Sequence, residues 1–137
     1  MRNLRIITAV AALLLATVAP LAGALATEPT LGDIKRTNLL RNDLSVPGRE
    51  AIQVLVEFEP GVTAVKHSHP GEEIVYVTKG SLEYRLEGKS PVVVRAGEAL
   101  FIPDGTPHSV KNVGSDRAAE LATYVVEKEK PLLTVRE

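Results

Sequence analysis

The feature that most constrains this chain is a two-residue period in its hydrophobic pattern. Apolar side chains occupy every second position over residues 52–58 and again over residues 82–86, and most residues between them are polar or charged. Because side chains on a β-strand alternate between two faces, this pattern predicts strands with one buried and one more exposed face. No segment after residue 26 shows a comparable helical period.

Turn-forming residues divide the same region into short segments. Glycine and proline recur at Pro60-Gly61, Pro70-Gly71, Lys79-Gly80, Gly88, Ala96-Gly97, Pro103 to Pro107 and Gly114. Short strands joined by regular turns predict an all-β sandwich or barrel. Two continuous apolar runs, residues 92–94 and 100–102, are typical of strands buried on both faces. We therefore expect both runs, together with Phe58 and Phe101, to lie in the core.

All three histidines of the chain fall into one pattern. His67 and His69 are two residues apart, so on a strand they project from the same face. Glu73 has the same parity beyond Pro70-Gly71, a turn that can bring the chain back toward the two imidazoles. His108 follows a second turn-rich stretch. We expect these four side chains to converge; the alternative is three surface histidines with a coincidental spacing.

Three imidazoles and one carboxylate are a ligand set for a transition metal. This set suits one divalent ion of Fe, Mn, Co, Ni, Cu or Zn and poorly suits Ca or Mg, which prefer oxygen ligands only. In an octahedral ion, His67, His69, Glu73 and His108 would leave two positions open for water, dioxygen or a chelating substrate. The identity of the metal stays open at this point.

Composition excludes several classes of partner. The net charge is −1 at pH 7 and no basic cluster is present, so nucleic acid is not an expected partner. Aromatic residues make up 4% of the chain and Trp is absent, so stacking surfaces for bases or sugars are scarce. The chain has no cysteine, so a disulfide cannot stabilise it.

The first 26 residues resemble a secretory signal peptide. A basic head over residues 1–5 precedes an apolar stretch over residues 6–18, and Ala24-Leu25-Ala26 provides small residues at a cleavage site. Arg2 and Arg5 are not adjacent, which favours a Sec-type signal over a twin-arginine signal. We expect a periplasmic or secreted protein with no stable membrane span after cleavage; the alternative is an uncleaved anchor, for which the apolar stretch is short.

From residue 51 onward the chain resembles a cupin. The first motif of that family matches Gly61, His67, His69, Glu73 and Gly80, and the second matches Gly97, Pro103, Gly105, His108 and Asn112. The resemblance extends over about residues 51–126. It implies a jelly-roll barrel with a metal held inside by His67, His69, Glu73 and His108, and turns at Gly80, Gly97 and Gly105.

The resemblance also implies a domain organisation. We expect a signal peptide over residues 1–26, an N-terminal arm over 27–47, the barrel over 48–130 and a C-terminal tail over 131–137. Cupins often dimerise through edge strands, and the arm, with a short strand near residues 36–40, is the segment expected to pair in a homodimer. The alternative for the arm is a flexible leader.

Neither the fold nor the ligand set decides the reaction. We expect first a dioxygenase-like enzyme acting on a small organic acid or a diphenol, with isomerase or lyase chemistry as variants. The alternatives are a module that binds a small ligand without chemistry and a metal that only braces the barrel. Because all three histidines are expected to bind the metal, proton transfer would use Glu73, metal-bound hydroxide, Tyr84 or Glu72. Tyr84 is also expected as a core aromatic with its hydroxyl at the rim, and Glu72 as a solvent-facing residue.

Overall fold

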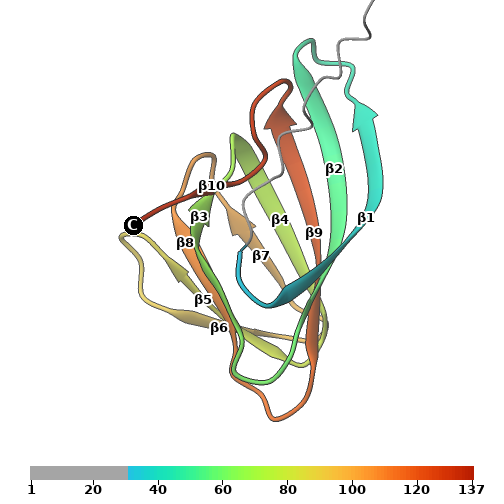
Figure 1. Ribbon diagram of the computed structural model, residues 1–137. Coiled ribbons are helices and arrows are strands. Elements are labelled where there is room, and N and C mark those ends of the chain that lie inside the picture. The colour runs from blue at the N-terminus through green and yellow to red at the C-terminus, as the bar shows by residue number, and fades with distance from the viewer. Residues whose placement is uncertain (1–30) are drawn as a thin grey trace, which may run out of the picture.

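The structure, a computed structural model, describes residues 31–137 (Figure 1). The expected signal peptide over residues 1–26 lies outside the described residues. Residues 31–137 form ten strands and no helix. The strands are β1 (Ile34–Asp43), β2 (Arg49–Phe58), β3 (Thr63–Ser68), β4 (Gly71–Lys79), β5 (Ser81–Leu86), β6 (Val92–Arg95), β7 (Ala99–Ile102), β8 (His108–Asn112), β9 (Ala118–Glu127) and β10 (Thr134–Val135). Within this part of the chain there is accordingly no helix long and apolar enough to cross a membrane.

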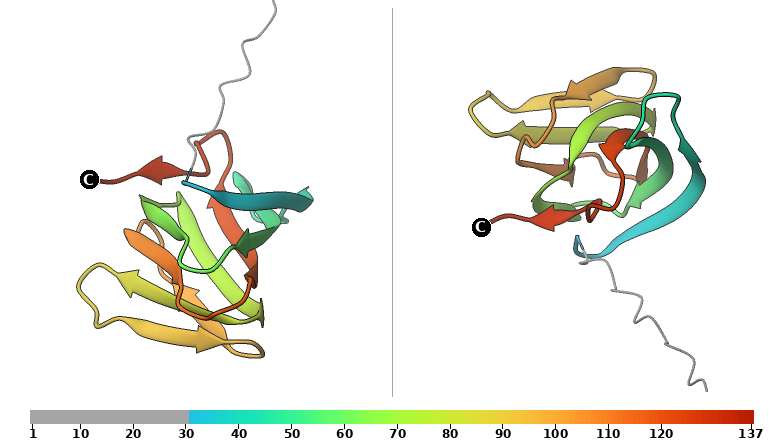
Figure 2. Two further views of the ribbon diagram at one scale, coloured as in Figure 1. Left: turned by 60° about the horizontal axis from the view of Figure 1, so that its bottom comes forward. Right: turned by 90° about the horizontal axis from the view of Figure 1, so that it is seen from above.

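The strands form two five-stranded sheets. Their orders are β1-β2-β9-β4-β7 and β10-β3-β8-β5-β6, so strands distant in sequence are neighbours in space. All pairs within the sheets are antiparallel. Seen from above, the strands surround a common interior (Figure 2). This arrangement confirms the expected all-β jelly-roll.

The core lies where the apolar faces of the two sheets meet. Every second side chain of β2, from Ile52 to Phe58, is at most 5% exposed, and Leu82 and Tyr84 of β5 are fully buried. The two-residue period therefore predicted the buried face of both strands correctly. Burying one such apolar side chain contributes roughly 1.5–3 kcal/mol to stability.

The expectation that two apolar runs are buried on both faces was wrong. Val92 in β6 is 40% exposed and Phe101 in β7 is 55% exposed. Both strands are only four residues long and lie at the edges of their sheets. Side chains on the outward face of a sheet stay in contact with solvent wherever no further layer covers that face, and Ile74 and Tyr76 of the non-edge strand β4 are exposed in the same way. Phe58 belongs to the core as expected, and Phe101 does not.

Residues at both ends of the described chain extend the sheets. β1 is longer than the strand expected near residues 36–40 and pairs with β2 along its whole length. At the other end, residues 131–137 pack against the barrel. Leu132 and Leu133 are buried, and β10 pairs with β3. The glycines expected in turns, Gly80, Gly97 and Gly105, have φ values of 74°, 91° and 67°.

Asn112 at the end of β8 connects three segments of backbone. Its Nδ2 donates to the carbonyl oxygens of Phe58 (3.1 Å) and Asp116 (2.8 Å), and its Oδ1 accepts from the amide of Gly114 (2.9 Å). The side chain is 1% exposed, so water cannot replace these bonds.

Replacing Asn112 with alanine should therefore lower the free energy of unfolding by about 3 kcal/mol, because buried backbone groups lose their partners. Urea unfolding measures the change. Asn42→Ala is the matched control, since the Asn42 amide makes only an exposed bond to its neighbour Asp43. Equal destabilisation by the two variants would contradict this reading of Asn112.

Candidate metal centre

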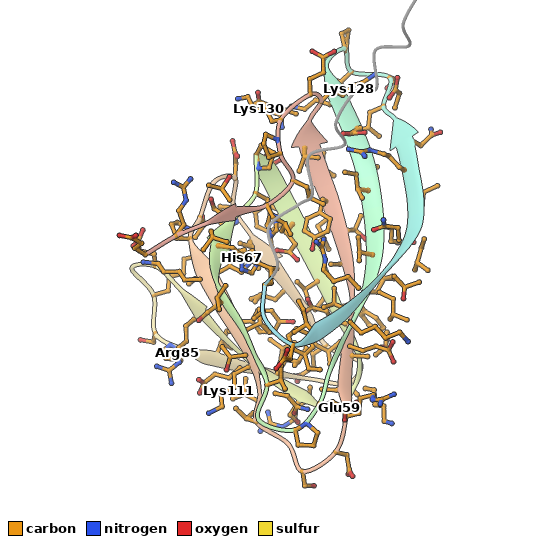
Figure 3. The ribbon with its side chains drawn as sticks, viewed as in Figure 1. Glu59, His67, Arg85, Lys111, Lys128 and Lys130 are labelled. Atoms are coloured by element: carbon orange, nitrogen blue, oxygen red, sulfur yellow. The ribbon has the colours of Figure 1, made fainter. Side chains whose placement is uncertain are left out.

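The structure brings His67, His69, Glu73 and His108 together inside the barrel. His67 lies in β3 opposite His108 of β8 in the strand register, His69 follows β3 directly, and Glu73 is in β4. The four residues are between 1% and 4% exposed. In Figure 3 the labelled His67 lies within the molecule, whereas the labelled Arg85 and Lys111 lie at its periphery.

The ligand atoms of these side chains are close to one another. The three imidazoles each offer a nitrogen within 4.8 Å of the others. One carboxylate oxygen of Glu73, Oε2, lies 3.1 Å from Nε2 of His69 and 3.2 Å from Nε2 of His108. Glu73 thus lies beside the histidine cluster, on the side of His69 and His108.

Backbone carbonyl oxygens set the orientation of all three imidazoles. The Nδ1-to-oxygen pairs are His67 with Val65 (2.6 Å), His69 with Leu132 (2.8 Å) and His108 with Thr106 (2.9 Å). A carbonyl oxygen can only accept, so each Nδ1 carries a proton and, in the neutral ring, each Nε2 keeps a lone pair. This is the pattern by which outer partners orient metal-ligating histidines.

Hydrogen-bond acceptor atoms therefore face one another at the centre of the cluster. Nε2 of His69 and Oε2 of Glu73 are buried without a hydrogen-bond partner, although they are 3.1 Å apart. Two lone pairs at this distance repel each other, and burial without a partner costs each atom roughly 1–3 kcal/mol. A shared cation would remove both penalties, so the residues present fit a divalent metal ion.

The protonation states agree with this reading. Burial, helped by the nearby His108, lowers the pKa of His67 to about 4, so its imidazole is neutral at pH 7. Burial opposes ionisation of Glu73, but the adjacent imidazoles of His108 and His69 hold its pKa well below the usual range. Burial would lower the pKa of His108, yet Glu73 raises it. A proton and a metal ion would compete for the position between His108 and Glu73.

A small cavity of about 10 Å³ adjoins the cluster. Its lining includes His67, Glu73 and His108 together with Arg36, Glu120 and Tyr124. The volume is close to the smallest that holds one water molecule. A larger hollow of about 260 Å³ lies under β1, between residues 38–41, Ile52 and Leu132, and includes none of the four expected ligands.

The two candidates for proton transfer, Tyr84 and Glu72, lie in different environments. Tyr84 is fully buried and its hydroxyl donates to the carboxylate of Glu120, so the hydroxyl is not at the rim as expected. Burial raises the pKa of Tyr84 well above its usual range and that of Glu120 to about 8. Glu72 points away from the cluster, as its parity predicted. Its side chain is 40% exposed and lies 4.0 Å from Arg49.

Sequence reasoning missed Arg36, Glu120, Tyr124 and the carbonyl of Leu132. A signal for Glu120 was present, because it shares the parity of Ala118, Ala122 and Val126 on the inward face of β9. A glutamate at an apolar-face position marks a buried carboxylate. No comparable signal existed for Leu132, whose carbonyl reaches His69 across 63 residues of chain.

Comparison with known proteins adds sequence relatives. The sequence profile of the family described as "Cupin domain" matches residues 54–126, slightly more than half of the 137-residue chain. Polyketide synthase CurC of Streptomyces cyaneus is 34% identical over 88 residues, covering 64% of this chain. Oxalate-binding protein of Thermotoga maritima is 27% identical over 96 residues, covering 69% of this chain and 78% of that protein. The match covers 54% of the polyketide synthase, so the chain spans about half the length of that relative.

Solved structures resemble the fold as well. Oxalate oxidase in complex with the substrate analogue glycolate superimposes with a TM-score of 0.61 and 28% identity. The superposition covers 80% of this chain and 57% of the oxidase. Sequence and fold comparisons therefore point to the same group of proteins.

Proposed function

The chain belongs to the cupin domain family, and from this premise we propose that it is a metal-dependent enzyme acting on a small organic acid. The observation that carries the proposal is the convergence of acceptor atoms from His67, His69, Glu73 and His108 in a buried cluster. We propose that these four residues hold one divalent transition ion: Fe, Mn, Ni, Cu or Zn.

The residues around the ion would have separable tasks. The ion would supply an electrophilic centre for a substrate oxygen and, if redox-active, electron exchange with dioxygen. The carbonyls of Val65, Thr106 and Leu132 hold the imidazoles in place. Because all three histidines are assigned to the ion, the Glu120 carboxyl, which is hydrogen-bonded to Tyr84 and lines the cavity, is a group that could hold a proton.

Two similarities favour an acid over a diphenol as the substrate. One sequence relative is called an oxalate-binding protein, and one similar structure is an oxalate oxidase with glycolate bound. Both ligands are two-carbon acids, whereas a diphenol is much larger. The chain spans 57% of the oxidase.

Oxygen uptake tests the enzymatic proposal. Protein loaded separately with Fe²⁺, Mn²⁺ or Cu²⁺ is mixed with glycolate or oxalate, first without air and then with air. We expect consumption of oxygen and acid only with metal and air present. Turnover without oxygen would contradict oxidative chemistry and indicate an isomerase or lyase.

A non-catalytic binding module is the second candidate. It is favoured by the cavity of about 10 Å³, which leaves little room for a substrate and dioxygen together. In that case the metal-loaded protein would bind the acid and return it unchanged after prolonged incubation in air. Mass spectrometry of the recovered acid separates the two functions.

Removing the metal should lower the melting temperature. A ligand that binds only the folded state contributes about 2.7 kcal/mol at a concentration one hundred times its Kd. For a domain of this size we expect a loss of roughly 10 °C after chelation, restored by adding the ion. Differential scanning calorimetry measures the shift, and equal melting with and without metal would contradict a metal at this cluster.

We also propose export through the signal peptide over residues 1–26 and assembly as a homodimer. In the absence of cysteine, metal binding and oligomerisation would supplement core packing in an exported domain. Fractionation of the native host and light scattering test the two proposals separately.

A further inference from the structure

We infer that Arg36 is the anion-binding residue of the proposed site, and that it binds the carboxylate of a small acid and selects it over neutral analogues. The inference rests on the proposed metal centre and names the substrate class of that same site. It starts from the position of Arg36 on the inward face of β1.

The strand register places Arg36 in a row that crosses three strands. Arg36 and Ile34 are partly buried, whereas Lys35 between them is exposed. Arg36 is opposite Val56 of β2, and Val56 is opposite Glu120 of β9. The side chain of Arg36 therefore extends over the interior of the barrel toward Glu120, while Lys35 extends to solvent.

Two of the three guanidinium nitrogens of Arg36 are out of contact with solvent. Its Nε and Nη2 atoms have essentially no accessible surface, and Arg36 lines the cavity that also reaches His67, Glu73 and His108. Its charge acts on Glu120 and Tyr124, where burial raises the pKa values and Arg36 is among the groups that oppose the rise. Removing a guanidinium from water costs desolvation free energy, which a bound anion would offset.

The charges around the cavity favour an anion. A divalent ion and Arg36 together carry more positive charge than Glu73 and Glu120 neutralise. A planar carboxylate can accept two parallel hydrogen bonds from a guanidinium, whereas a neutral amide or diphenol cannot. A small hydroxy acid or dicarboxylate is thus the ligand that satisfies both cationic centres.

The size of the cavity limits the ligand further. A volume of about 10 Å³ admits little more than one water, so side chains that line the cavity must move to admit an acid. β1 is at the edge of its sheet and pairs only with β2, which allows this end of the site to adjust. Acids of two or three carbons are the expected size.

The test uses Zn²⁺-loaded full chain and glycolate as the probe, with glycolamide as its neutral analogue. We expect Arg36→Gln to lower glycolate affinity about tenfold or more and to reduce the preference for glycolate over glycolamide, with Zn²⁺ affinity nearly unchanged. Lys35→Gln is the matched control, because it removes one positive charge from the adjacent residue, whose side chain is 71% exposed. This control should bind glycolate like the wild type.

A second measurement does not depend on the folding of a variant. In the wild-type protein, the Nε resonance of Arg36 should shift on saturation with glycolate, and Arg36→Lys identifies the signal by its loss. An unmoved resonance, an unchanged glycolate affinity in Arg36→Gln, or Zn²⁺-loaded wild type that binds no glycolate would overturn the inference and leave the metal centre intact. A wild type that binds no metal would instead overturn the proposed function.

Discussion

Replacing His69 with alanine is expected to weaken metal binding by more than about 100-fold, since loss of a mere outer partner of a ligand already costs about 10–100-fold. His69 supplies one imidazole Nε2 and is the residue through which the C-terminal segment meets the cluster, by way of the Leu132 carbonyl. Its loss removes one ligand and one of the two imidazoles whose Nε2 lies within 3.2 Å of Glu73. Competition with a chromogenic chelator measures the affinity for Zn²⁺.

Lys66→Ala is the matched control for His69→Ala. Lys66 lies in the same strand as His67, but its side chain is 40% exposed and pairs with Glu87 at the surface. Such exposed pairs contribute about 0–1 kcal/mol, so this variant should keep both its stability and its metal affinity. A His69→Ala protein with the metal affinity of the wild type would refute the ligand assignment.

Replacing Gly71 with alanine is expected to have the largest effect on stability, a loss of more than about 4 kcal/mol. Gly71 begins β4 and is opposite Val126 of β9 in the strand register. A Cβ at this position would lie 2.2 Å from the carbonyl oxygen of Val125 and 2.7 Å from the Cα of Val126. Both are backbone atoms of a central strand, so neither can move without breaking the pairing of β4 with β9. Since domains are stable by only about 5–15 kcal/mol, much of the protein would unfold.

Gly88→Ala separates the clash from the conformational strain of losing a glycine. Gly88 has a φ of 73°, and no atom lies within 4 Å of the added Cβ. We expect this control to lose only about 1–2 kcal/mol, the cost of a left-handed backbone for a residue with a Cβ. Guanidinium unfolding compares the two variants. Similar losses would contradict the close approach of β4 and β9.

Local periodicity accounts for what could be predicted from the sequence. The alternation at residues 52–58 and 82–86 identified buried faces correctly, because alternation is a property of each strand alone. The spacing of His67, His69 and Glu73 likewise depends on one strand and one turn. His108 lies far away in the sequence. Its place beside the other ligands was predicted from the resemblance of its surroundings to the second cupin motif.

Contacts set by the order of strands could not be predicted in this way. Val92 and Phe101 were expected in the core but lie on outward faces of the sheets, and an apolar run does not tell whether a further layer covers its outward face. The role of Leu132 depends on a backbone carbonyl, a group that every residue carries and that leaves no mark in the sequence.

The sequence by itself determined the strand pattern, the turns and the residues able to bind a metal, since all of these follow from side-chain type and short spacing. Only the tertiary structure decided which atoms surround them. It placed Arg36 and Glu120 beside the cavity and the Leu132 carbonyl on His69, because register and sheet order bring together groups that are far apart along the chain. Those long-range neighbours control burial and charge at the centre, and so they govern its chemistry.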